Sequence, residues 1–170
     1  NVTPALFGGC QIVVRDHNAL VRSQVSFPEN LHAVLFVPDF PMPTAQARDM
    51  LSHTVNRDDA VYNSGRVALL VNALATGRTE QLRVATQDRL HQPARQKLLP
   101  VMQLLFRSAL NAGAMGVFLS GAGSTVLALT QGKELTVAYE MADTANKAGV
   151  QGEIKITRPS ANGAFVTPLS

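Results

Sequence analysis

Short apolar runs dominate the first part of the chain, and helical stripes follow them. Residues 11–15 are rich in apolar β-branched side chains and residues 21–27 alternate apolar with polar ones, so we expect these segments to pair as a β-hairpin. Residues 31–37 form a continuous apolar run that ends at Pro38, which is the pattern of a strand buried on both faces. The three prolines within residues 38–43 predict a rigid loop.

Two helices are predicted after this loop. Thr44 has the character of an N-cap, so a short helix is expected to run from it to about Leu51. A longer helix is expected to begin after Asn56 or Asp58, whose side chains suit a helix N-terminus, and to end at Gly77. Its apolar stripe has helical spacing and consists of Val61, Ser64, Val67, Ala68, Val71, Leu74 and Ala75.

Further helices are expected in the second half of the chain. Thr79 is predicted to cap a short helix that runs through Ala85. Pro100 suits the first position of another helix, which Gly113 should end. The inner face of that helix should consist of Val101, Met102, Leu105, Phe106, Ala109 and Leu110. A last helix is predicted over residues 134–148.

The remaining segments complete an α+β pattern. Four further strands are predicted, at residues 116–119, 125–130, 153–157 and 164–167. This order of elements predicts an antiparallel sheet covered by helices, with one helical layer lying against one sheet. The terminal part of the chain resembles a ferredoxin-like split unit.

Composition narrows the class of protein. The 170 residues suit one domain, and 46% apolar against 16% charged residues is enough to build a buried core. No apolar run is long enough to cross a bilayer, so no membrane association is expected. The formal net charge of +3 comes without a basic stripe interleaved with aromatic residues, so nucleic acid is not an expected partner. The single cysteine, Cys10, cannot form an internal disulfide, which suits a reducing compartment.

A run of small residues at 120–125 is the clearest local signal of chemistry. It lies between two predicted strands, and its glycines let backbone N–H groups approach an anion or a neighbouring loop. A plain hairpin turn explains the same residues equally well. The run is not a classical phosphate-binding loop, because no lysine follows the glycines.

Scattered arginines beside loop segments form a second signal. Arg48 lies one helical turn after Thr44 on the same face, and Arg95 lies shortly before Pro100. A guanidinium group can hold a carboxylate through two parallel hydrogen bonds, so the two arginines are candidate ligands for an anionic small molecule. For any one of them, an ordinary surface position remains the alternative.

Other chemistries find little support. The four histidines lack metal-ligand spacing and no cysteine pairs with them, so no metal site is predicted in this chain. Ser120 lacks the strand–turn–helix setting of a hydrolase nucleophile. Asp39 and Asp88 remain candidate acid or base groups, whereas Asp58 and Asp59 are better explained as charges at a helix start.

Four segments resemble motifs of one enzyme family, and they are residues 1–9, 37–48, 88–95 and 116–125. Together they resemble the C-terminal portion of the homoserine kinases, a family within the GHMP kinase superfamily. The resemblance extends over nearly the whole chain. The 116–125 segment looks like a motif shared across the superfamily, whereas the other three segments narrow the resemblance to the homoserine kinases.

The resemblance implies ATP-dependent phosphorylation of the side-chain hydroxyl of L-homoserine, in threonine biosynthesis. It also implies that the amino-acid substrate is bound by Asn1, Thr44, Arg48 and Arg95. The segment implied to support the phosphate loop consists of Ser120, Gly121, Ala122, Gly123, Ser124 and Thr125. Two residues depart from the family pattern, because Ser124 stands in place of a proline and Ala94 in place of a tyrosine.

The same resemblance leads us to expect an incomplete protein. The chain opens without an initiator Met and with apolar residues at once, which suggests a cut through a folded protein. The glycine-rich loop of the superfamily, Pro-x-x-x-Gly-Leu-Gly-Ser-Ser, and its acidic Mg²⁺ ligand are not found in this sequence. ATP and Mg²⁺ are therefore expected to bind mainly through an upstream half, and this chain alone is expected to be inactive. Residues 1–30 would be the tail of the N-terminal domain, and residues 31–170 the C-terminal domain.

Alternatives to this assignment stay open. A different GHMP kinase, acting on mevalonate-type or sugar substrates, would share the 116–125 motif. A non-catalytic, ferredoxin-like ligand-binding domain is the alternative from another functional class. The family implies a cytoplasmic location, or the plastid stroma for a plant enzyme, and homodimers are common within it.

Overall fold

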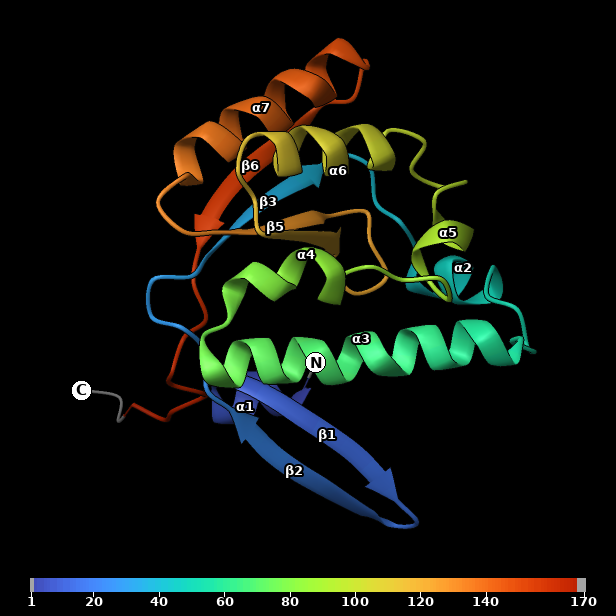
Figure 1. Cartoon of the computed structure of the whole chain (residues 1–170), viewed down its shortest axis with the longest axis vertical. Helices are drawn as coiled ribbons and strands as arrows, with labels where there is room; N and C mark the ends of the chain where they lie inside the picture. The colour runs from blue at the N-terminus through green and yellow to red at the C-terminus, as the bar shows by residue number, and fades with distance from the viewer. Residues whose placement is uncertain (1, 168–170) are drawn as a thin grey trace.

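A four-stranded antiparallel sheet forms the centre of the computed structural model, which describes residues 2–167 (Figure 1). Its strands are β3 (His32–Pro38), β4 (Gly116–Leu119), β5 (Val126–Thr130) and β6 (Gly152–Thr157). They are ordered β4-β5-β3-β6, and every neighbouring pair is antiparallel. This arrangement confirms the predicted α+β fold with a ferredoxin-like unit.

Helices cover both faces of the sheet, whereas the sequence had suggested a single helical layer. On one face lie α6 (Met102–Asn111) and α7 (Glu134–Lys147), and on the other lie α3 (Arg57–Thr76), the 3-10 turn η1 (Thr79–Gln81) and α4 (Leu82–Ala85) (Figure 1). The two-residue period of β3 explains how one strand serves both layers. Val34 and Phe36 are buried against α6 and α7, while Ala33 and Leu35 pack toward α3 and α4. The continuous apolar run was therefore correctly taken as a strand buried on both faces.

The predicted hairpin is present, but it does not join the central sheet. Strands β1 (Cys10–Asp16) and β2 (Ala19–Val25) pair antiparallel in a two-stranded sheet of their own. Figure 1 shows this hairpin projecting beyond α3, away from the four-stranded sheet. The expectation of one sheet was wrong because β3 pairs with β5 along one edge and with β6 along the other, which leaves no edge of β3 for the hairpin.

The two ends of the described chain lie together. A short helix, α1 (Val2–Phe7), precedes the hairpin, and no periodicity had predicted it. Residues 164–167 are irregular, so the predicted closing strand is wrong. The N–H of Ala164 instead donates to the carbonyl of Leu6 (3.2 Å), and Gly163 lies so close to the backbone of Leu6 that a side chain could not fit. The two ends of the chain are therefore held together by close backbone packing, and not by the hydrogen bonds of paired strands.

Some helix ends lie where the capping residues predicted them, and others do not. The side chain of Asn56 accepts from the N–H of Asp59 (2.8 Å), and Gly77 adopts the left-handed conformation (φ 70°), so both predicted ends of α3 are confirmed. Thr44 is not a cap, because α2 (Thr44–Asp49) begins at it and the N-cap position belongs to Pro43. Arg78, not Thr79, precedes η1, and α6 begins two residues after Pro100.

Of the predicted stripe of α3, only Val71 and Leu74 are half-buried or buried. Val61 and Val67 are 64% and 60% exposed, whereas Ala73 and Leu74 are buried against the sheet. The half-buried side chains of its first turns are instead those of Tyr62, Asn63 and Arg66, which bond to Gln87 and Asp88, so the inward face of α3 is rotated from the predicted one. Within residues 2–167, no helix combines the length and the apolar character needed to cross a membrane.

Asp88 fixes the connection between α4 and a four-residue helix that was not predicted, α5 (Gln92–Arg95). Its carboxylate accepts from the backbone N–H groups of Gln92 (2.6 Å), His91 (2.7 Å) and Leu90 (3.3 Å). Asn63 Nδ2 donates to the same carboxylate from α3 at 2.5 Å. Burial by itself raises the pKa of Asp88, but these hydrogen bonds outweigh it and hold the pKa below the ordinary value for aspartate.

Replacing Leu105 with alanine should lower the free energy of unfolding by about 2–5 kcal/mol, because its fully buried side chain on α6 would leave a cavity. The neighbouring Leu104 is 44% exposed, so Leu104→Ala should cost about 0.5 kcal/mol or less. Urea unfolding of both variants measures the difference. Equal losses would mean that α6 buries a different face.

The lowered pKa of Asp88 predicts a pH-dependent contribution to stability. A carboxylate with a lowered pKa in the folded state stabilises the fold above its unfolded pKa, and this stabilisation is lost as pH falls through the folded pKa. Asp88→Asn should therefore reduce the free energy of unfolding by about 1–3 kcal/mol at neutral pH and by less in acid. Urea titrations at several pH values test this, with the exposed Glu29→Gln as control. A difference between Asp88→Asn and the wild type that does not change with pH would contradict it.

Candidate functional site

The glycine loop at residues 120–125 closes the hairpin between β4 and β5. The N–H of Ser120 donates to the carbonyl of Thr125 (2.9 Å), and the N–H of Gly123 donates to the carbonyl of Ser120 (3.0 Å). Gly121 and Gly123 have φ values of 58° and 92°, which other residues rarely adopt. Across the described residues, no hydrogen bond uses the N–H groups of Gly121 or Ala122. The loop is thus a hairpin turn that still presents backbone donors.

This loop is anchored to the proline-rich segment that follows β3. Ser124, which is only 7% exposed, donates from its hydroxyl to the carbonyl of Phe40 (3.1 Å). A side chain at Gly123 would meet the sulfur of Met42 at 3.3 Å. The serine that departs from the family pattern therefore provides a hydrogen bond that a proline could not make.

Arg95 joins the glycine loop to α2. Its side chain is 8% exposed at the end of α5. Arg95 Nη1 donates to the carbonyl of Gly121 (3.0 Å), and Arg95 Nε donates to the carbonyl of Ala47 (3.4 Å). No carboxylate between residues 2 and 167 forms an ion pair with this guanidinium. The site therefore contains a buried cation held by two backbone carbonyl dipoles.

The other residues predicted to bind substrate are less closely gathered. Arg95 contacts the backbone of α2 at Ala47, and Arg48 is the next residue along the chain. The side chain of Arg48 is exposed and forms no ion pair within residues 2–167. Thr44 is also exposed, at the start of α2. Asn1 lies outside the described residues. Arg95 thus contacts the predicted glycine loop through the carbonyl of Gly121, and it contacts α2 through the carbonyl of Ala47.

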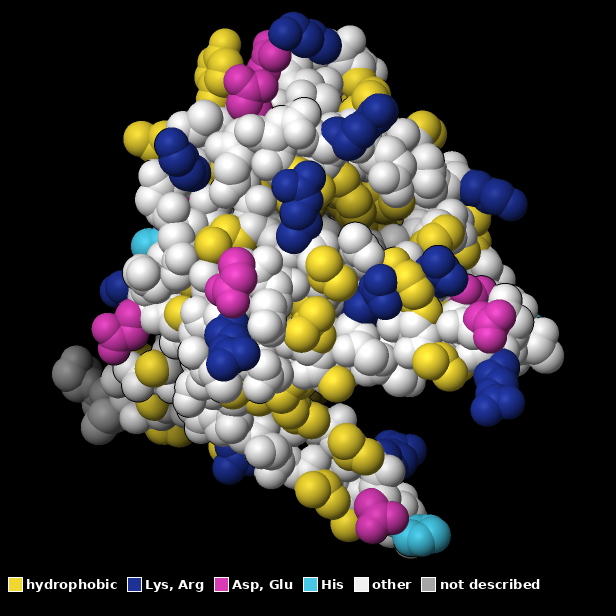
Figure 2. Space-filling view, viewed as in Figure 1, with side chains coloured by type: hydrophobic (Ala, Val, Ile, Leu, Met, Phe, Trp, Pro, Cys, Tyr) yellow, Lys and Arg dark blue, Asp and Glu magenta, His cyan; other side chains and the backbone are white. Residues whose placement is uncertain are grey.

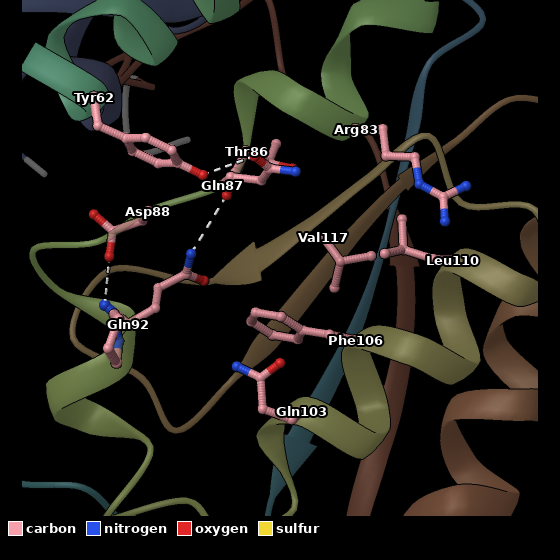
Figure 3. A pocket seen from close by; sticks show the side chains of 11 residues that line it. Tyr62, Arg83, Thr86, Gln87, Asp88, Gln92, Gln103, Phe106, Leu110 and Val117 are labelled. Atoms are coloured by element: carbon pink, nitrogen blue, oxygen red, sulfur yellow. Dashed lines mark hydrogen bonds between the residues drawn. The ribbon is translucent and has the colours of Figure 1, made fainter. Parts of the chain in front are cut away.

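Gln92 ties α5 to the strand that leads into the loop. Gln92 Oε1 accepts from the backbone N–H of Leu119 (2.9 Å), the last residue of β4, and Gln92 Nε2 donates to the carbonyl of Thr86 (3.3 Å). Figure 3 shows the side chain of Gln92 directed at Thr86, with the carboxylate of Asp88 bonded to the backbone of Gln92. No local pattern in the sequence distinguishes Gln92, although it lies in the 88–95 segment.

A pocket of about 460 Å³ opens beside this arrangement. Its lining combines Arg95 and Gly121 with the apolar residues Leu70, Phe118 and Leu119 and the charged residues Arg66 and Asp88. A cationic group next to an apolar wall suits a small ligand that combines an anionic group with a short aliphatic chain. No group of three or more His, Cys, Asp or Glu side chains within residues 2–167 could hold a metal ion.

Comparisons with known proteins find similarity to one group of kinases. Residues 70–151 match the family described as GHMP kinases C terminal. The chain is 39% identical over 172 residues to the homoserine kinase of Synechocystis sp., which covers 99% of this chain and 56% of that protein. It is 49% identical over 130 residues to the homoserine kinase of Gloeobacter violaceus, which covers 76% of this chain and 43% of that protein.

A solved structure of a homoserine kinase also has a similar fold. The crystal structure of homoserine kinase from Cytophaga hutchinsonii matches with a TM-score of 0.88 and 29% identity, over 96% of this chain and 52% of that one. The chain spans about half the length of the proteins it matches. Residues 70–151 therefore match the GHMP kinase C-terminal family, and the chain as a whole is similar to the homoserine kinases.

Proposed function

We propose that this chain supplies the amino-acid binding part of a longer homoserine kinase, which transfers a phosphoryl group from ATP to the side-chain hydroxyl of L-homoserine in threonine biosynthesis. The similarity to several homoserine kinases, at 37–49% identity, supports this substrate over mevalonate-type or sugar substrates. The observation that carries the proposal is the buried guanidinium of Arg95, which lacks a carboxylate partner within residues 2–167.

A buried cation without a counter-ion is costly, so this position favours an anionic ligand. The carboxylate of homoserine supplies that charge, and each charge-assisted hydrogen bond to it would contribute about 1.5–3 kcal/mol. The two bonds to Ala47 and Gly121 hold the guanidinium in place, while its other N–H donors can reach a ligand. Arg48, Thr44 and Asn1 complete the substrate site in this proposal.

The glycine loop has a separate role in the proposal. The N–H groups of Gly121 and Ala122, which are unused within residues 2–167, can support the upstream nucleotide-binding loop or an oxygen of the transferring phosphate. Holding the homoserine carboxylate at Arg95, beside this loop, orients the substrate hydroxyl for in-line attack on the phosphate. Positioning of this kind accounts for much of the rate gain in phosphoryl transfer.

Nucleotide and metal binding are assigned to the upstream half of the longer protein. The glycine-rich ATP loop of the superfamily is not found in this sequence. The described residues also do not fit a Mg²⁺ site, since their acidic side chains form no cluster. We therefore assign no step to a metal in this chain. The single cysteine suits the cytoplasm as the location of the protein.

We also propose that residues 1–30 complete the N-terminal domain and residues 31–170 form the C-terminal domain. The β1–β2 hairpin supports this division because it forms a sheet separate from the central one. Val14, Leu20 and Val21 on the hairpin are each more than half exposed. Figure 2 shows apolar side chains along the projecting hairpin, which suits packing against a further domain.

Arg95→Ala in the full-length protein should raise the KM for homoserine by at least about tenfold and change the KM for ATP by much less, because the substrate carboxylate loses its buried partner. Steady-state kinetics with each substrate varied in turn measures both constants. Arg107→Ala, on the exposed side of α6, serves as the matched control. Equal changes in the two constants for Arg95→Ala would contradict the carboxylate assignment.

The isolated 170 residues should form no phosphohomoserine from ATP and homoserine, because the superfamily's ATP loop is not part of them. Chromatography of the products after prolonged incubation provides the measurement, and the full-length protein provides the positive control. Turnover by the isolated chain would show that its own residues bind ATP productively. Homoserine binding without turnover would agree with the proposal.

A further inference from the structure

We propose that Gln92 is a positioning residue, which sets the guanidinium of Arg95 relative to the glycine loop and so tunes the affinity for the amino-acid substrate. This inference rests on the proposed function, because it concerns how the same site is held in place.

Helix α5 is too short to define its own position. It contains four residues, and a helix of this length is not stable by itself in water. Its placement must therefore come from contacts with longer elements. Arg95 lies at its last position, so any tilt of α5 moves the guanidinium away from the carbonyls of Ala47 and Gly121.

The first contact holds the N-terminal end of α5 to α3. Asp88 accepts from the backbone of His91 and Gln92, and Asn63 of α3 donates to the same carboxylate. Asn63 Oδ1 also accepts from the backbone N–H of Arg89 (3.0 Å). These bonds fix where the helix begins, but they leave its rotation toward the sheet undetermined.

The second contact, through Gln92, fixes that rotation. The bond from the N–H of Leu119 to Gln92 Oε1 attaches α5 to the residue immediately before the glycine loop. Gln92 and Arg95 are three residues apart, so their side chains project from neighbouring positions on the helix. One side chain thus contacts the strand leading into the loop, and the other contacts Gly121 within it. Two hydrogen bonds, one to each side chain, therefore set the distance between α5 and the glycine loop.

A purely structural role for Gln92 makes a different prediction. An ordinary buried hydrogen bond would lower stability when removed, without a selective effect on one substrate. A positioning role acts through Arg95, so the effect on homoserine should vanish once Arg95 itself is removed. This difference makes a double-mutant cycle informative.

The test uses Gln92→Ala in the full-length protein. We expect a rise of roughly tenfold in the KM for homoserine, with a change in the KM for ATP of about twofold or less, because small displacements of a substrate-binding group are costly. Gln96→Ala is the matched control, because Gln96 is an exposed glutamine at the end of the same helix.

The decisive measurement is Gln92→Ala combined with Arg95→Ala. The double variant should have the same KM for homoserine as Arg95→Ala alone, within about twofold. Additive effects, or equal effects of Gln92→Ala on both substrates, would overturn the positioning role while leaving the function of Arg95 intact. If Arg95→Ala alone leaves the KM for homoserine unchanged, the proposed function fails instead. Thermal melting of each variant separates loss of folded protein from loss of affinity.

Discussion

The burial of one positive charge is the constraint on which the rest of the site depends. Arg95 as a whole is only 8% exposed, and the hydrogen-bond partners of its guanidinium within residues 2–167 are two carbonyl oxygens. The two carbonyl dipoles reduce the free-energy cost of burying the cation, but they do not neutralise its charge. The proposed carboxylate site rests on this residue, because an anion bound beside it would offset the cost of burying its charge.

Three segments that are distant in the sequence meet at this charge. Helix α2 follows β3, α5 follows α4, and the glycine loop joins β4 to β5. The central sheet brings them together because β3 and β5 are neighbours and β4 lies beside β5. The strands thus determine where the loops converge, and the loops carry the polar groups.

In the proposed function, this chain carries one of two binding functions. Its described residues offer a cationic position, an apolar wall and backbone donors, which suit recognition of a small amino acid. They offer no acidic cluster for a metal. The projecting hairpin has exposed apolar side chains, and the matched kinases are about twice as long as this chain. In the proposed function, the acceptor and the nucleotide bind to different parts of a longer protein.

Local rules in the sequence determined the features that depend on neighbouring residues. The apolar run of β3, the Asn56 and Gly77 ends of α3 and the inner face of α6 all follow from short-range periodicity or capping. The glycine run and its role as a turn were also visible in the sequence. Family resemblance pointed to Arg95, although no local pattern distinguished it from a surface arginine.

Only the tertiary structure decided which distant groups meet. The bond between Asn63 and Asp88 spans 25 residues, and the bond from Arg95 to Ala47 spans 48. The same is true of the hairpin's separate sheet and of the irregular segment at 164–167, which both looked like strands of one sheet. Such choices depend on the packing of whole layers, and no short window of sequence records which surface a segment will face.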